Sequence, residues 1–169
     1  MKTFKADCLD RPFRAAVKSV LAKVQKQIVV ITGEFSVLNY YHDLRIDLDT
    51  LFKERTVKFK VYMAEENYGV INKMFFLNPG RTEVYVGKKK VEDHYLICDD
   101  SYFVHTRKHK RDACGVRAGE YEDENPQRGR RYIRQKGLNR LFDELISQEG
   151  VKKISGPDMS KDPLYAELT

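Results

Sequence analysis

Histidine and arginine side chains alternate near residue 105, and imidazole and guanidinium groups are suited to holding a phosphate. His105, Arg107 and His109 are spaced two residues apart. If the strand predicted over this part of the chain continues through all three, their side chains lie on one face of a sheet. The spacing therefore favours a phosphate-binding cluster.

A second histidine comes close to this cluster if the strands on either side of Asp99-Asp100 form a hairpin. Pairing about this turn brings His94 near His105 or Thr106. The sharper hypothesis is a phosphate site that includes His94, His105 and Arg107, with His94 and His105 as candidate catalytic groups. The plainer alternative is that His94 is a hydrogen-bonded sheet residue and the others are exposed charges at a loop edge.

Zinc binding is a weaker alternative for the same region. Cys98, His105, His109 and Cys114 supply four suitable ligands with the spacing C-x6-H-x3-H-x4-C. The gaps do not match the usual spacing of a zinc finger, and Cys98 falls within an apolar strand, where a thiol is commonly part of the core. The chain also lacks a Walker A loop, a GxGxxG fingerprint and a GxSxG elbow. We therefore expect neither a metal nor a cofactor.

The net charge of +6 is concentrated in one segment of the 169-residue chain. Residues 107–140 hold 11 Lys and Arg against 5 Asp and Glu, whereas the remainder holds 20 of each sign. A local basic block is typical of a surface that binds a polyanion. The alternative is an ordinary solvated loop and helix start. The residues predicted to contact phosphate are the following: Arg107, Lys108, His109, Lys110, Arg111, Arg128, Arg130, Arg131 and Arg134.

Hydrophobic periodicity predicts the elements that position these residues. Helices are expected from about residue 11 to 24, at 44–52, at 64–77 and at 132–146; strands are expected at 27–32, 56–63, 82–86, 94–98 and 102–107. Residues 108–130 contain three glycines and a proline and are predicted to be a long connection. The order α-β-α-β-α-β-β-β-α predicts an α/β fold with a mixed, mostly parallel sheet and helices on both faces. We expect one domain over residues 1–149 and a C-terminal extension over 150–169.

This order and several local patterns resemble the phospholipase D-like fold, which carries the HxKxxxxD phosphodiesterase motif. Residues 51–61 are similar to a helix running into a strand of that family, residues 77–86 to the strand before the motif, and residues 94–104 to the motif hairpin. The resemblance covers roughly residues 13–146. It implies the fold of that family and a phosphate-bearing substrate or ligand.

The catalytic motif itself is degenerate. Aligned on the turn, Asp99 takes the place of the motif aspartate, His94 that of the lysine and Glu92 that of the nucleophilic histidine. A shifted register that makes His94 the nucleophile places Leu96 and Ser101 at the other two positions. The family pairs two copies of the motif, so the resemblance implies a homodimer if any catalysis remains. Binding without catalysis is the favoured interpretation.

Three functions stay open from the sequence: binding of DNA or RNA by a degenerate phospholipase D-like protein, a metal-independent phosphodiesterase or nuclease acting as a dimer, and a viral or mobile-element module that binds an acidic protein partner. No apolar run approaches the roughly 18 residues of a membrane-spanning helix, so no membrane partner is expected. An odd number of cysteines and an N-terminus without an apolar signal segment favour a cytoplasmic location, or a nuclear one in a nucleated cell.

Overall fold

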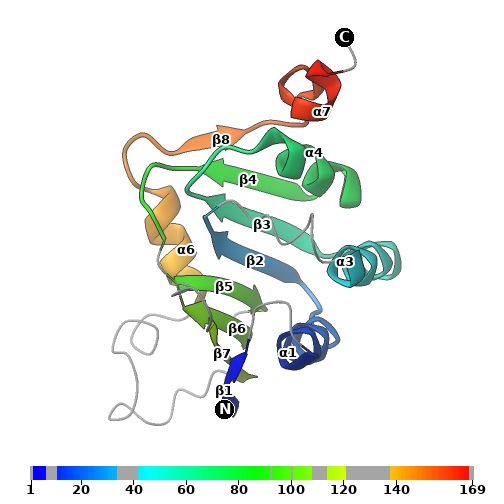
Figure 1. Cartoon of the computed structure of the whole chain (residues 1–169), viewed down its shortest axis with the longest axis vertical. Helices are drawn as coiled ribbons and strands as arrows, with labels where there is room; N and C mark the ends of the chain where they lie inside the picture. Colours follow the sequence, from blue (N-terminus) through cyan, green and yellow to red (C-terminus); the bar gives the residue numbers. More distant parts are fainter. Residues whose placement is uncertain are drawn as a thin grey trace.

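One mixed sheet in the order β1-β7-β6-β5-β2-β3-β4-β8 forms the centre of the computed structural model (Figure 1). The structure describes residues 2–6, 11–33, 42–91, 93–99, 101–107, 114–120 and 138–167. The strands are β1 (Lys2–Ala6), β2 (Gln27–Thr32), β3 (Lys58–Met63), β4 (Thr82–Val86), β5 (Asp93–Cys98), β6 (Tyr102–Arg107), β7 (Cys114–Glu120) and β8 (Lys152–Ile154). The helices are α1 (Arg11–Leu21), α3 (His42–Glu54), α4 (Tyr68–Leu77), α6 (Leu138–Ile146), the short 3-10 helix η1 (Met159–Lys161) and α7 (Pro163–Ala166).

Parallel pairing occupies the middle of the sheet. β2 pairs parallel with β3, and β3 pairs parallel with β4, whereas the outer strands join antiparallel. The continuous apolar run of β2 is buried on both faces, as its β-branched composition predicts. The α/β class with a mixed sheet is confirmed.

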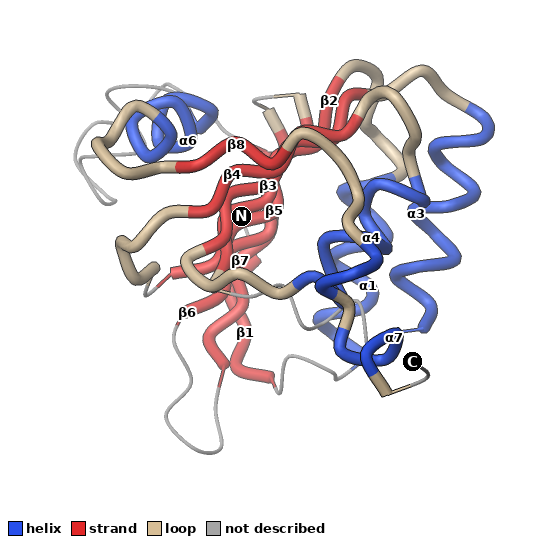
Figure 2. Tube along the Cα trace, turned by 90° about the horizontal axis from the view of Figure 1, so that it is seen from above, coloured by secondary structure: helices blue, strands red, loops and turns tan. Residues whose placement is uncertain are grey.

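Helices cover both faces of the sheet, as expected from the sequence. In Figure 2, α1, α3 and α4 lie on one side of the strands and α6 lies on the other. The core between the sheet and α1, α3 and α4 contains Phe59, Val61 and Met74, which are fully buried. The second core is smaller and is built around Tyr62 and Phe142. Alternation along each strand therefore assigns its side chains to an α4 face or an α6 face.

Three strands lie where no strand was predicted. Cys114–Glu120 forms β7, inside the segment that was expected to be a connection, and Lys2–Ala6 forms β1 at the sheet edge. Lys152–Ile154 forms β8 in the expected C-terminal extension. Gly115 and Gly119 give β7 a low intrinsic strand propensity, but it pairs with β6 on one side and β1 on the other. Neighbouring strands therefore impose the conformation. The predicted final helix begins at Leu138, and residues 132–137 lie outside the described residues.

The C-terminal segment is attached to the domain by strand pairing and by side-chain hydrogen bonds. β8 pairs antiparallel with β4. Asn72 of α4, which is 2% exposed, donates from its side-chain amide to the Asp158 carbonyl (3.1 Å) and accepts from the Asp158 N–H (2.7 Å). Since a buried amide must be satisfied, this bond pair fixes the path of the segment towards α7. The division into a domain and an extension stays a prediction.

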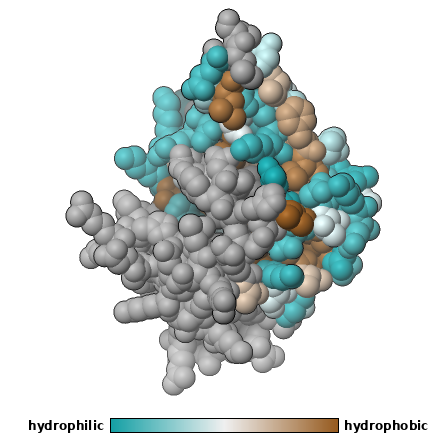
Figure 3. Space-filling view, turned by 45° about the vertical axis from the view of Figure 1, so that its right-hand side comes forward, coloured by the Kyte–Doolittle hydropathy of each residue, from teal (hydrophilic) through white to brown (hydrophobic). Residues whose placement is uncertain are grey.

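The surface of the helical side is mixed in polarity. Figure 3 shows separate brown, apolar patches among teal, hydrophilic atoms. Among the described residues, the large apolar side chains that are exposed come from α3, α4 and the C-terminal segment: Ile46, Phe76, Met159, Leu164 and Tyr165.

Candidate functional site

Several strand ends meet at one edge of the sheet, which we call the carboxyl edge. The parallel strands β2, β3 and β4 end there, and their arrowheads point to the same side in Figure 1. The antiparallel register places the start of β5, the end of β6 and the start of β8 at this edge too. Ligands of open α/β sheets bind outside the carboxyl ends of the strands. This edge is therefore the candidate site.

His94 lies at the centre of the carboxyl edge, on the α4 face. Its Nδ1 is 3.1 Å from the Thr32 hydroxyl, and a Cβ on Gly33 would stand 3.9 Å from its Cε1. The loop that follows β3 is held beside His94, because the Ala64 and Glu65 N–H groups donate to the Gly33 carbonyl at 2.8 and 3.1 Å. His94 is thus a half-buried, hydrogen-bonded sheet residue at the carboxyl edge.

His105 does not join His94. In the β5–β6 hairpin His94 pairs with Thr106, whereas His105 pairs with Tyr95, so the two histidines lie on opposite faces of the sheet. Three residues, 99–101, separate the two strands, whereas a two-residue turn would pair His94 with His105. The extra residue shifts the register by one, and such a shift moves a side chain to the other face of the sheet. The expected convergence of His94 and His105 is wrong, although the pairing of His94 with Thr106 is confirmed.

His105 has a buried environment of its own on the α6 face. Its ring stacks on Tyr95 with centroids 4.6 Å apart and planes 12° apart. Its Nε2 lies 3.4 Å from a carboxylate oxygen of Asp93. With 3% of its surface exposed, His105 is placed to stabilise the sheet and is poorly placed to reach a polymer.

Asp99 lies at the end of β5 opposite to His94. Five residues along a strand span roughly 17 Å, so Asp99 and His94 belong to different ends of the sheet. The Asp99 carboxylate accepts from the backbone N–H groups of Gln25, Lys26 and Gln27 at 2.6, 2.8 and 2.9 Å. The residue aligned with the motif aspartate therefore holds the chain as it enters β2.

Two of the four residues considered as zinc ligands, Cys98 and His105, lie on opposite faces of the sheet. Cys98 is fully buried in the core on the α4 face, while His105 lies on the α6 face. Burial raises the pKa of the Cys98 thiol to about 12, and zinc binds the thiolate. His109 lies outside the described residues. Cys98 is therefore a core residue.

The structure describes three parts of the basic segment: its first residue, residues 114–120 in β7 and residues 138–140 at the start of α6. Register puts the Arg107 backbone at the carboxyl edge, opposite Asp93. The other residues predicted to contact phosphate lie outside the described residues: Lys108, His109, Lys110, Arg111, Arg128, Arg130, Arg131 and Arg134.

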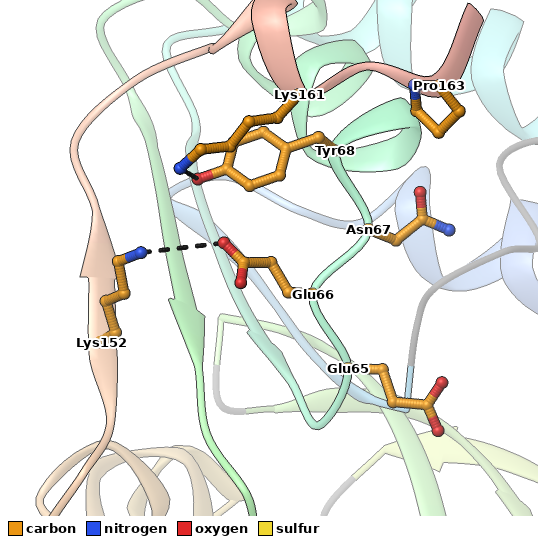
Figure 4. Close-up of a pocket in the computed structure, with 7 residues that line it drawn as sticks. All are labelled: Glu65, Glu66, Asn67, Tyr68, Lys152, Lys161 and Pro163. Carbon is orange, nitrogen blue, oxygen red and sulfur yellow. Dashed lines mark hydrogen bonds and ion pairs between the residues drawn. The ribbon is translucent and has the colours of Figure 1, made fainter. Parts of the chain in front are cut away.

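A polar pocket of about 500 Å³ opens between the start of α4 and the C-terminal segment (Figure 4). Lys152 lies 3.8 Å from a Glu66 carboxylate oxygen. Lys161 donates to the Tyr68 hydroxyl at 3.4 Å and lies 3.6 Å from Asp158, and the hydroxyl raises the pKa of this lysine. Both ammonium groups thus have partners, which makes the pocket a poor phosphate site.

Neither this pocket nor the bond between Thr32 and His94 was predicted from the sequence. Lys152 and Lys161 are more than 80 residues from Glu66 and Tyr68, and no local spacing connects them. The end of the β2 run at Thr32-Gly33 was a usable signal, because strand ends followed by glycine often border sites in parallel sheets.

Neither a protein-family model nor a curated protein sequence matches this chain. Among solved structures, the phosphatidylserine synthase of Haemophilus influenzae Rd KW20 is similar with a TM-score of 0.60 at 15% identity, over 99% of this chain and 44% of the other. The archaeal chromatin protein TrmBL2, described as showing a novel mode of DNA binding, has a TM-score of 0.49 at 16% identity, over 69% and 46% of the two chains.

The similarity to the synthase, a phospholipase D-superfamily member, supports a phospholipase D-like fold. The present chain spans less than half the length of either of these two structures. Within the described residues, no helix is long and apolar enough to cross a membrane.

Proposed function

We propose that this protein binds nucleic acid by its phosphate backbone, through the basic segment 107–140, on a scaffold whose phosphodiesterase site is degenerate. The observation that carries the proposal is the position of the charge. The whole excess of +6 belongs to this segment, and the segment begins with Arg107 at the carboxyl edge of the sheet. A local excess of arginine and lysine supplies most of the affinity for a polyphosphate.

The surroundings of the candidate catalytic groups favour binding over catalysis. General acid and nucleophile must both reach the scissile phosphate, but His94 and His105 lie on opposite faces of the sheet. Asp99 is at the far end of β5, engaged with three backbone N–H groups. A single chain therefore has no pair of histidines arranged for phosphodiester cleavage among these residues.

Salt titration tests the proposal. We expect the logarithm of the binding constant for a 20-base-pair duplex to fall steeply with the logarithm of salt concentration, by about 0.9 per phosphate contact. The combined substitutions K108A, K110A and R111A, or R128A, R130A and R131A, should each reduce this slope by about 2 to 3. Fluorescence anisotropy of a labelled duplex measures both quantities. Weak binding that is unchanged between low and moderate salt would contradict the proposal.

A dimeric, metal-independent phosphodiesterase is the second candidate, and the position of His94 favours it. A partly buried imidazole at the carboxyl edge, hydrogen-bonded to Thr32, is placed where a second subunit can supply the other histidine. Cleavage of a labelled single strand that persists in EDTA and disappears in His94→Ala would support it. The His94→Gln variant retains much of the side-chain volume and serves as the structural control. No cleavage by the wild-type protein excludes this activity on that substrate.

A further inference from the structure

A second group of lysines lies at the carboxyl edge, far in sequence from the basic segment. Residues 87–91 connect the end of β4 to the start of β5 and must pass the ends of β3 and β2, because the strand order is β5-β2-β3-β4. Figure 1 shows this connection descending from the tip of β4 to β5. It contains Lys88, Lys89 and Lys90, all exposed, and we call these three residues the lysine strap.

The backbone of the strap is held in place from below. The Gly87 N–H donates to the Met63 carbonyl at 2.9 Å, and the Tyr62 hydroxyl donates to the Lys89 carbonyl at 3.2 Å. At its end Val91 packs into the core on the α6 face. Because the anchors are backbone groups and an apolar side chain, the three ammonium groups are not used to fix the strap. Binding a polyanion would therefore cost little ordering of the backbone.

The lysines of the strap have no ion-pair partner among the described residues. Across the part of the chain that the structure describes, no carboxylate forms an ion pair with any of the three lysines. Asp93, the first residue of β5, lies beside His105 instead. A formal charge of +3 thus stands exposed at the edge where Arg107 ends β6.

The strap is supported from the α6 face, and the last residues of the basic segment form the start of α6. Tyr62 and Val91, which border the strap, belong to the core cluster that includes Phe142 of α6. The two described ends of the sequence block 107–140 therefore lie on the same edge or face as the strap: Arg107 ends β6 at the carboxyl edge, and residues 138–140 begin α6.

We propose that the lysine strap is a second phosphate-contacting element, and that the nucleic-acid backbone runs along the carboxyl edge from Lys88–Lys90 to Arg107. This inference rests on the proposed function and adds a site to it. Four strand spacings separate β4 from β6, a distance of roughly 19 Å. At about 3.4 Å per base pair, this corresponds to five or six base pairs of duplex.

A matched pair of triple variants tests the inference. The strap variant carries K88A, K89A and K90A. The control carries K26A, K58A and R81A, which remove three exposed cations from the opposite edge of the sheet and leave the same net charge. Binding of a labelled 20-base-pair duplex is measured by anisotropy over a series of salt concentrations, and thermal unfolding of all proteins confirms that each is folded.

We expect the strap variant to bind about tenfold more weakly and to lower the salt slope by about 2 to 3, with a change of less than about threefold in the control. Equal effects of the two variants would overturn the proposal that the strap contacts phosphate. They would leave the proposed function standing, because the wild-type protein still binds. Failure of the wild-type protein to bind the duplex would overturn both.

Discussion

Replacing Asp99 by alanine is expected to lower the free energy of unfolding by about 3 kcal/mol, and the melting temperature by roughly 6–12 °C. The carboxylate accepts three backbone N–H bonds of 2.6–2.9 Å from residues 25–27. Bonds to a charged acceptor are worth more than neutral ones, but two of these N–H groups are solvent-exposed and recover hydration. Asp99 also has a φ of 56°, which alanine tolerates less well than aspartate.

Three further variants separate these contributions. Asp99→Gly removes the acceptors without the backbone strain, so it should cost about 1 kcal/mol less than alanine. Asp99→Asn keeps one acceptor oxygen and should cost about half as much as alanine. Asp49→Ala is the control, because its exposed ion pair with Lys53 is worth less than about 0.5 kcal/mol. Urea unfolding measures all four. An alanine variant within 0.5 kcal/mol of wild type would show that the bonds contribute little.

Asp99 also shows what sequence alone could and could not establish. A turn after Cys98 was predicted and is present, with the Ser101 N–H donating to the Cys98 carbonyl at 3.1 Å. The partners of the Asp99 carboxylate, however, are 72 to 74 residues earlier in the chain. The strand and turn follow from local residue preferences, whereas the use of the side chain depends on which strand β5 pairs with.

The two histidines illustrate a second limit. The apolar runs of β5 and β6 were enough to predict both strands. Whether His94 and His105 share a face depends on whether two or three residues form the turn, and Asp99-Asp100-Ser101 permits either. The alternation of β2, β3 and β4 with helices gave the parallel centre correctly, because long apolar runs separated by amphipathic helices have few other arrangements.

The lysine strap has no signal in the charge distribution along the sequence, for a related reason. Counting charge along the chain finds 107–140 because its cations outnumber its acids by six, while Lys88–Lys90 belongs to the remainder, whose charges balance. Strand order then brings the short run to the edge that receives Arg107. Charge balance in sequence therefore does not imply charge balance on a surface.

Replacing Gly87 by alanine is expected to lower the free energy of unfolding by about 2–3 kcal/mol. A Cβ at this position would stand 2.5 Å from the Tyr62 hydroxyl oxygen, 2.9 Å from Cε2 and 3.0 Å from Cζ. The Tyr62 ring is fully buried and cannot swing away. Gly156→Ala is the matched control, since its Cβ would meet nothing within 4 Å and should change stability by less than about 1 kcal/mol.

A double-mutant cycle with Tyr62→Phe locates the clash. Burial raises the pKa of Tyr62, so its hydroxyl stays protonated and donates to the Lys89 carbonyl. Tyr62→Phe alone should cost about 1 kcal/mol for this bond. In the Gly87→Ala background the same change also removes the closest contact, so the double variant should be at least 0.5 kcal/mol more stable than the sum of the single effects predicts. If the two effects on the free energy of unfolding are strictly additive, the strain in Gly87→Ala does not come from the contact with the Tyr62 hydroxyl.

The same glycine links stability to the proposed binding surface. Gly87→Ala removes no charge, but it forces apart the start of the strap and the ring that supports it. If Lys88–Lys90 contact phosphate from a fixed backbone, duplex affinity should fall several-fold at temperatures where the variant is fully folded, and Tyr62→Phe should restore part of it. Unchanged affinity in a destabilised variant would mean that any phosphate contacts of the strap do not depend on its fixed backbone. The cycle therefore distinguishes a preorganised element from lysines that act only through their charge.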